Sequence, residues 1–319
     1  MQEDKQIKKC TRCGLCASVC PLYEIKPSEK TIARGKFLQL LGVLKGDLIL
    51  NKKIRDNINF CLNCSKCTQN CPSEINALEL FASIKHKNLT FIEKILNSKF
   101  AFKFKLSPIK FIFPPSRKLS LKKGEIYFKG CVPNYSNFGE NTCCGLPYIA
   151  SGNIEAANTM IKKNIKIIEN PRVKKVYFDC ASCMQTVANY PFKNPEAIEK
   201  LVLLEPLYFP EDKKFSIHKP CHMSQKEFFT LEETLKKRVN YISAYDDKNF
   251  RCCGFGGTFF IKHPLVALEL CLRNAQKFID LKTDYVLSPC PVCTLGLRFG
   301  MWYLKFIKGK KHNVKIKQY

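Results

Sequence analysis

Two cysteine runs near the start of the chain constrain its fold more than any other feature. Each run has the pattern C-x₂-C-x₂-C-x₃-C and is followed by a proline, Pro21 or Pro72. The eight cysteines are Cys10, Cys13, Cys16, Cys20, Cys61, Cys64, Cys67 and Cys71. Three cysteines at this spacing wrap one turn of loop around a single centre, and the fourth faces away from it. The runs therefore predict two neighbouring metal centres that exchange ligands.

The ligand pattern favours two [4Fe–4S] clusters, because each cluster needs one thiolate at each iron. In the two-cluster arrangement the fourth cysteine of each run binds the other run's cluster. We therefore expect one quartet of Cys10, Cys13, Cys16 and Cys71 and another of Cys20, Cys61, Cys64 and Cys67. Zinc is the alternative, but structural zinc sites use cysteine pairs or Cys/His mixtures. Disulfides are disfavoured because the N-terminus lacks a secretory signal, which predicts a cytoplasmic protein with reduced thiols.

Length, composition and charge limit the number of domains and the kinds of partner that we expect. A chain of 319 residues with 45% hydrophobic content is expected to form about two domains. Its apolar stretches stop well short of the roughly 18 residues that a transmembrane helix needs. The net charge of +26 suggests nucleic acid, but each oxidised cluster with its thiolates offsets about two positive charges. We expect no nucleic-acid partner and a basic surface suited to an acidic subunit or to anionic lipid.

Residues 1–84 are expected to form an α-helical two-cluster domain, because the forty residues between the runs exceed what a tight hairpin requires. Ser28, Asp47 and Ser73 are the expected N-caps of three helices. Their apolar stripes are, in order, Phe37, Leu40, Leu41 and Leu44; Ile54 and Ile58; and Ile75, Leu78, Phe81 and Ile84. The cluster loops should lie at helix N-termini, where backbone N–H groups can point at the sulfurs.

Residues 85–123 are the expected basic linker. They contain eleven lysines or arginines but one acid, Glu93, and Pro108, Pro114 and Pro115 break any long helix. The favoured interpretation is a connector whose phenylalanines pack onto the neighbouring domains. The alternative is a contact patch for a membrane surface or a partner subunit.

Residues 124–206 and 207–319 form an internal repeat. In each copy a short strand precedes one cysteine, a Cys-Cys-Gly triplet follows, and a C-x₂-C pair ends the motif. Helices are expected over 154–168 and from Pro264 to about residue 279, and strands over 173–178 and 284–287. The order strand, loop, helix, strand predicts an α/β module in two pseudo-symmetric copies. The ten matching cysteines are Cys131, Cys143, Cys144, Cys180, Cys183, Cys221, Cys252, Cys253, Cys290 and Cys293.

Five soft ligands in each copy favour further iron–sulfur centres, with zinc as the alternative. The spacing differs between the copies, because eleven residues separate Cys131 from Cys143 and thirty separate Cys221 from Cys252. The type of cluster is therefore open, above all in the first copy. The nineteenth cysteine, Cys271, lies within a helical apolar stripe and is expected to be a buried small hydrophobe.

These motifs resemble the cysteine-rich "CCG" domain, which occurs twice in the heterodisulfide reductase B subunit. Two CCG domains after a two-cluster ferredoxin segment are similar to the iron–sulfur subunits of glycolate oxidase and anaerobic glycerol-3-phosphate dehydrogenase. The segments that carry the resemblance include CTRCGLCASVCPLY, CLNCSKCTQNCPSEI, DCASCMQTVANYP and CCGFGGTF. The segments KPCHMS and CCGFGGTF are also similar to the lactate-utilisation iron–sulfur protein. The resemblance implies that the ten cysteines of the repeats bind one or two further [4Fe–4S] clusters.

The resemblance also implies electron transfer from a flavoprotein that carries FAD and oxidises a 2-hydroxy acid or glycerol phosphate, towards quinone. No G-x-G-x-x-G phosphate loop follows a strand in this sequence, so a separate flavin subunit is expected. The alternative function is reduction of a disulfide at the CCG clusters, where His222 could donate a proton. His222 is more simply a hydrogen-bonding neighbour of cluster sulfur. A peripheral position on the inner face of the cell membrane would fit a quinone acceptor.

Overall fold

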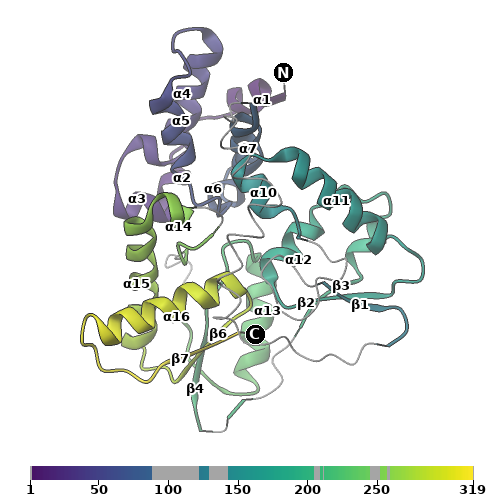
Figure 1. Ribbon diagram of the computed structural model, residues 1–319, viewed down its shortest axis with the longest axis vertical. Helices are drawn as coiled ribbons and strands as arrows, with labels where there is room; N and C mark the ends of the chain where they lie inside the picture. Colours follow the sequence, from purple (N-terminus) through teal and green to yellow (C-terminus); the bar gives the residue numbers. More distant parts are fainter. Residues whose placement is uncertain are drawn as a thin grey trace.

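The computed structural model describes residues 2–87, 122–128, 143–204, 209–210, 212–244, 252–256 and 259–318. Cys131 and most of the expected linker, residues 88–121, lie outside the described residues. In Figure 1 the N-terminal helical part stands above two α/β parts, the first repeat in teal and the second in green and yellow. The expected order of a helical domain followed by two α/β repeats is confirmed.

The N-terminal part is built from short helices around the two cysteine runs. They are α1 (Gln2–Lys8), α2 (Leu15–Ser18), α3 (Pro21–Ile25), the 3₁₀ turn η1 (Glu29–Thr31), α4 (Ala33–Lys45), α5 (Lys52–Asn59), α6 (Lys66–Gln69) and α7 (Ala77–Lys87). Their core joins α1, α4, α5 and α7 through Ile7, Phe37, Ile58 and Phe81. The expected stripes on α4 and α5 lie in this core as predicted. The exception is Leu44, which is 51% exposed.

Three expected helix caps were wrong or only partly right. Ser28 precedes η1, and α4 begins later, at Ala33. Asp47 caps nothing, because α5 begins at Lys52 and Asn51 accepts a hydrogen bond from the Ile54 N–H at 3.1 Å. Ser73 likewise lies four residues before α7. Asn76 caps α7 instead, since its side-chain oxygen accepts a hydrogen bond from the Glu79 N–H at 3.2 Å. Two of the three helices therefore begin at a nearby asparagine cap, and α4 begins without a side-chain cap.

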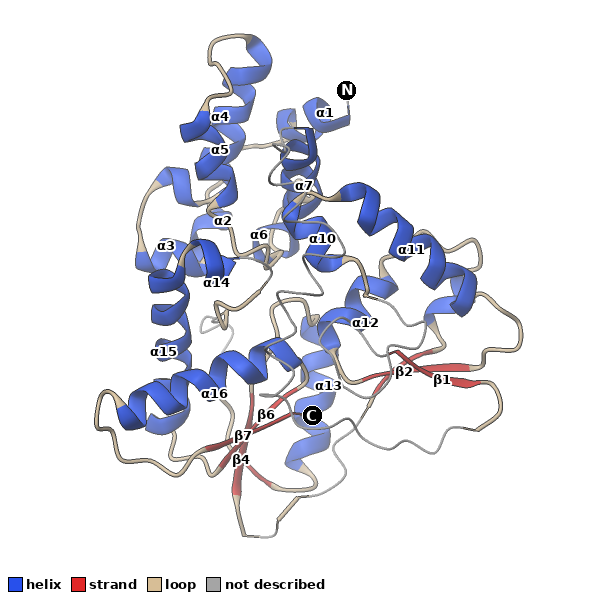
Figure 2. Cartoon of the chain, viewed as in Figure 1, coloured by secondary structure: helices blue, strands red, loops and turns tan. Residues whose placement is uncertain are grey.

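The two repeats each contain a parallel sheet with helices packed against it. The first repeat has β1 (Glu125–Phe128), α10 (Leu146–Ser151), α11 (Ile154–Ile168), β2 (Lys175–Phe178), α12 (Ala181–Ala188), η3 (Pro195–Ile198) and β3 (Leu201–Leu203). The second has β4 (Lys214–Ile217), α13 (Gln225–Lys236), β5 (Asn240–Tyr241), α14 (Phe259–Lys262), α15 (Pro264–Asp280), β6 (Tyr285–Ser288), α16 (Pro291–Phe306) and β7 (Lys315–Gln318). Figure 2 shows both sheets, in red, in the lower half of the view, with α13 and α16 beside β4, β6 and β7.

The two sheets share the same three-strand order, and the second has one additional strand, β5. Strand order is β1-β2-β3 in the first repeat and β5-β4-β6-β7 in the second, and every described pair is parallel. The expected helices over 154–168 and from Pro264 are confirmed. Strand β7 at the C-terminus was not predicted, because its lysine-rich sequence hides a single buried residue, Ile316.

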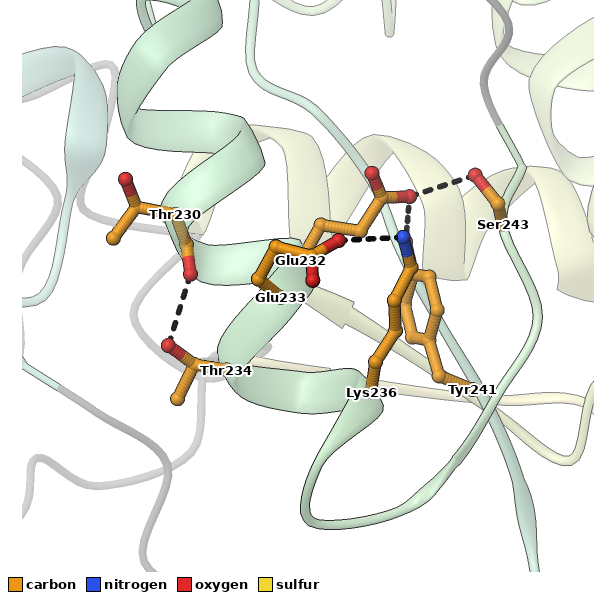
Figure 3. Close-up of polar contacts among 7 residues, drawn as sticks. All are labelled: Thr230, Glu232, Glu233, Thr234, Lys236, Tyr241 and Ser243. Atoms are coloured by element: carbon orange, nitrogen blue, oxygen red, sulfur yellow. Dashed lines mark hydrogen bonds and ion pairs between the residues drawn. The ribbon is translucent and has the colours of Figure 1, made fainter.

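The thirty residues between Cys221 and Cys252 account for the addition, since α13 and β5 lie there. A buried carboxylate ties the two elements together (Figure 3). Glu232 of α13 accepts hydrogen bonds from the Tyr241 hydroxyl at 2.8 Å and the Ser243 hydroxyl at 2.7 Å. The second repeat therefore gains an edge strand that has no counterpart among the described residues of the first.

The helical part packs directly on both repeats. Leu22 and Leu62 share an apolar cluster with Cys252, Phe259 and Leu270 of the second repeat. On the other side, His86 Nδ1 of α7 lies 3.1 Å from the carbonyl oxygen of Gly152 in the first repeat. Among the described residues, no helix combines the length and apolar character needed to cross a bilayer.

Candidate metal centres and the chamber between the repeats

An outer pocket is formed by the first cysteine run and the last cysteine of the second. Cys10, Cys13, Cys16 and Cys71 line it together with Cys67, around about 420 Å³ of empty space. Arg12 and Gly14 flank Cys13 in left-handed backbone conformations, with φ of 62° and 85°. Gly14 is also the N-cap of α2. The loop therefore curls around the pocket, and the Cys13 thiol is left exposed.

An inner pocket is formed by the second run and Cys20. Cys20, Cys61, Cys64 and Cys67 line it together with Cys16, around about 490 Å³ of empty space. Its loop repeats the conformation of the first, because Asn63 and Ser65 flank Cys64 with φ of 53° and 58°. The Asn63 N–H donates to the Cys61 sulfur at 3.4 Å. The structure thus brings together, around two adjacent spaces, the two quartets expected from the sequence.

Burial changes the acidity of the inner thiols. It raises the pKa of Cys64 and Cys67 well above the ordinary value for a thiol, and that of Cys20 as well. Thiolates at these positions therefore need a strong source of positive charge, and iron supplies it. Lys36 and Lys66 also line the inner pocket. The donor set of the two pockets fits iron–sulfur clusters, which need four thiolates each.

The Cys-Cys-Gly loops of the two repeats share a tight turn at the glycine. Gly145 and Gly254 have φ of 84° and 77°, a conformation that side chains disfavour. A Cβ on Gly145 would lie 3.5 Å from the Ala157 carbonyl oxygen, and one on Gly254 would lie 2.7 Å from that of Ala267. Ala157 lies on α11 and Ala267 on α15, and only at Gly254 does the close approach of the helix leave no room for a Cβ.

A buried asparagine holds each of these loops. Asn164 of α11 donates to the carbonyl oxygen of Cys143 at 3.1 Å, and Asn274 of α15 donates to that of Cys252 at 2.8 Å. Both side chains are almost fully buried. This pair was not predicted from the sequence, although the two asparagines lie at matching positions, twenty residues after Cys144 and twenty-one after Cys253.

The C-x₂-C pairs lie at strand ends. Cys180 follows β2 and is the N-cap of α12, and Cys290 follows β6 and is the N-cap of α16. The Ala181 N–H donates to the carbonyl oxygen of Pro289 at 2.7 Å, so the two strand ends meet across the boundary between the repeats. The sequence predicted five ligands in each repeat and one or two clusters, and the structure places the two C-x₂-C pairs side by side.

A chamber between the repeats collects thiols from both. It is open to solvent and spans about 810 Å³ including that open space, and its cysteine lining is Cys144, Cys180, Cys183, Cys221, Cys253, Cys290 and Cys293. Hydrogen bonds from neighbouring thiols lower the pKa of Cys253 to about 6 and hold that of Cys290 well below the ordinary value. Within the described residues, no group of three or more His, Cys, Asp or Glu side chains is arranged to hold a single metal ion. The thiols surround an extended space.

The chamber touches the inner pocket through the loop of the second cysteine run. Leu62 and Asn63 line both spaces. His222, next to Cys221, has its Nε2 2.9 Å from the Asn63 carbonyl oxygen, so this nitrogen carries the proton of the hydrogen bond. Lys85 of α7 donates to the Asn63 side-chain oxygen at 3.3 Å and to the Ala150 carbonyl oxygen at 3.1 Å. These contacts fix the helical part against the chamber.

Seventeen of the eighteen expected ligands are therefore placed in one of the three spaces or directly beside it, and Cys131 lies outside the described residues. Their role as ligands stays a prediction. Cys271 is fully buried at the α15–α16 contact, and its thiol donates to the carbonyl oxygen of Gly296 at 2.7 Å. The expectation that it is a buried small hydrophobe is confirmed.

Two family descriptions match the chain. Residues 6–75 match a 4Fe-4S dicluster domain, and residues 127–188 and 215–298 match the cysteine-rich domain CCG. The matches cover both cysteine runs and both repeats. They agree with the iron–sulfur chemistry that the donor sets indicate.

Curated relatives extend over most of the chain at low identity. An uncharacterized iron–sulfur protein of Methanocaldococcus jannaschii is 25% identical, over 93% of this chain and 69% of its own length. The D subunit of the dihydromethanophenazine:CoB–CoM heterodisulfide reductase of Methanosarcina acetivorans is 24% identical, over 94% of this chain and 90% of its own length. The glycolate oxidase iron–sulfur subunit of Escherichia coli is 29% identical, over 24% of this chain and 18% of its own length.

Proposed function

Because the chain belongs to the iron–sulfur electron-transfer proteins that join a 4Fe–4S dicluster domain to cysteine-rich CCG domains, we propose that it is the electron-transfer subunit of a flavin-linked dehydrogenase. A partner subunit with FAD oxidises a 2-hydroxy acid or glycerol phosphate. This chain carries the electrons towards quinone or another acceptor. Two [4Fe–4S] clusters occupy the outer and inner pockets, and one or two more occupy the CCG motifs.

The observation that carries this proposal is the order of the three thiol-lined spaces. The outer and inner pockets share Cys16 and Cys67, and the inner pocket and the chamber share Leu62 and Asn63. Electrons pass efficiently only between centres that lie close together, and these spaces adjoin one another in a row. The row begins at the exposed Cys13 and ends between the repeats.

When bound, the clusters supply single electrons and accept them again. The residues of this chain hold the path in place. His222 joins the chamber wall to the inner loop through the Asn63 carbonyl oxygen, and Lys85 joins the same loop to the first repeat through the Ala150 carbonyl oxygen. The outer loop presents Cys13 to solvent, where a partner subunit can approach.

The test is purification of the tagged chain from its native cells without oxygen. We expect FAD to accompany it, and we expect the visible iron–sulfur absorbance to bleach on addition of glycolate, lactate or glycerol 3-phosphate. A Cys13→Ser variant should slow the bleaching, because it changes the outer centre. A preparation with intact clusters, no flavin and no bleaching by any of the three would contradict the proposal.

A second candidate function is reduction of a disulfide in the chamber. The observation that favours it is the chamber, a pocket open to solvent and lined by thiols of both repeats. The reaction would consume two electrons and two protons and release two thiols from one disulfide. The heterodisulfide reductase protein among the relatives covers nearly the whole chain.

The two candidates are separated by turnover without a partner. Reduced methyl viologen would supply one electron per molecule, and its oxidation would be followed after addition of a disulfide. Disulfide reduction predicts two viologens oxidised per disulfide and loss of this activity in Cys253→Ser. Absence of turnover by protein with its full iron content would leave the dehydrogenase subunit as the function.

A further inference from the structure

The inner pocket contains a lysine whose burial is unusual. Lys36 of α4 is 1% exposed. Its ammonium donates to the Phe60 carbonyl oxygen at 2.7 Å and lies 5.6 Å from the centre of the Phe81 ring. Neither of these two contact groups, a carbonyl oxygen and an aromatic ring, carries a negative charge. A buried ammonium costs several kcal/mol without a counter-charge, so its position in the lining of this cysteine-rich pocket indicates that an anionic group fills the pocket.

A second lysine lines the same pocket. Lys66 begins α6, between Cys64 and Cys67, and is 8% exposed. It interacts electrostatically with Cys64 and also with Cys221 and Cys252 of the second repeat. Lys66 therefore lies where the inner pocket meets the second repeat.

The outer pocket has a different electrostatic environment. Arg34 lines it, but its guanidinium pairs with the carboxylate of Glu29, with Nε 3.0 Å from Oε2. The Arg34 side chain is 27% exposed and that of Glu29 is 55% exposed. Water and the paired carboxylate both weaken the field of such a charge. The charges of the buried lysines in the inner pocket are screened less, so they produce a stronger field at the cluster position.

Reduction adds one negative charge to an iron–sulfur cluster, so a buried positive charge beside it favours the reduced form. We propose that Lys36 and Lys66 hold the inner [4Fe–4S] cluster at a more positive reduction potential than the outer one. An electron that arrives at the outer cluster then comes to rest beside the chamber. The inference uses the cluster assignment of the proposed function but not the identity of the partner.

The test is a redox titration of the whole chain followed by electron paramagnetic resonance. Cys13→Ser identifies the outer signal, because it alters that cluster alone. In wild-type protein the inner signal should have the more positive midpoint potential. In Lys36→Met it should move to a more negative potential, with the outer midpoint much less changed, and Lys36→Arg should restore most of the difference.

Lys45→Met is the matched control, since Lys45 is an exposed residue at the end of the same helix. It should leave both midpoints in place. Lys66→Met provides a second variant if Lys36→Met fails to assemble, and it should shift the inner signal in the same direction. Equal midpoints in the wild type, or an unmoved inner midpoint in variants with full iron content, would overturn the proposal. These readouts need no partner, so they stand apart from the test of the dehydrogenase function.

Discussion

The two cysteine-rich repeats hold their Cys-Cys-Gly loops by equivalent asparagine contacts, but the second leaves less room beside the loop glycine. A Cβ added to the loop glycine would lie 3.5 Å from the nearest carbonyl oxygen in the first repeat and 2.7 Å from it in the second. The asparagine contact shortens from 3.1 Å to 2.8 Å. The first repeat adds a tyrosine, since the Tyr190 hydroxyl donates to the Cys144 carbonyl oxygen at 2.8 Å. Cysteines at matching positions can thus lie in loops that differ in how well they tolerate substitution.

Removing one thiol from each repeat gives the largest expected effect. Cys144→Ser and Cys253→Ser should each lose about four irons per chain, the content of one [4Fe–4S] cluster. The measurement is iron and acid-labile sulfide per chain in anaerobic protein. Cys271→Ser is the matched control and should keep the full iron content, because Cys271 contacts a carbonyl oxygen at a helix contact. If either cysteine variant lost the iron of both repeats, the chamber would hold one centre shared by the repeats. The two repeats could then not be compared as separate sites.

Replacing each loop glycine with alanine tests how much room the two loops leave for a side chain. Gly145→Ala should lower the free energy of unfolding by about 1 kcal/mol, the cost of a left-handed alanine. Gly254→Ala should lower it by about 3 kcal/mol, because its Cβ also meets the Ala267 carbonyl oxygen. Denaturant unfolding followed by circular dichroism measures both. Equal losses would show that the loops are equally tolerant.

The asparagines should give a smaller difference in the opposite direction. Asn164→Leu removes the hydrogen bonds to the Cys143 carbonyl oxygen and the Tyr190 hydroxyl, and it should cost about 2 kcal/mol. Asn274→Leu removes the bond to the Cys252 carbonyl oxygen but also a buried amide oxygen that has no partner among the described residues, so it should cost about 1 kcal/mol. The unfolding midpoints of the two variants, compared at equal iron content, decide the order. A larger loss for Asn274→Leu would contradict this ranking.

Much of the framework could be predicted from the sequence, because spacing and periodicity are local properties. The two quartets, the repeat and the helices over 154–168 and from Pro264 follow from such patterns. Helix starts at Asp47 and Ser73 failed, since Asn51 and Asn76, which follow them, are the residues that cap those helices. Lys36 could not be singled out among 53 lysines and arginines. The convergence of both repeats on one chamber depends on contacts between distant strand ends, which no local pattern records.

The central claim is that the thiols of this chain hold iron–sulfur clusters in a row from Cys13 to the chamber. Iron and acid-labile sulfide per chain, measured on protein purified without oxygen, test it most directly. The account predicts more than about eight irons per chain, because two [4Fe–4S] clusters supply eight and the repeats add to them. A colourless protein loaded with zinc, or one with far fewer than about eight irons, would contradict it.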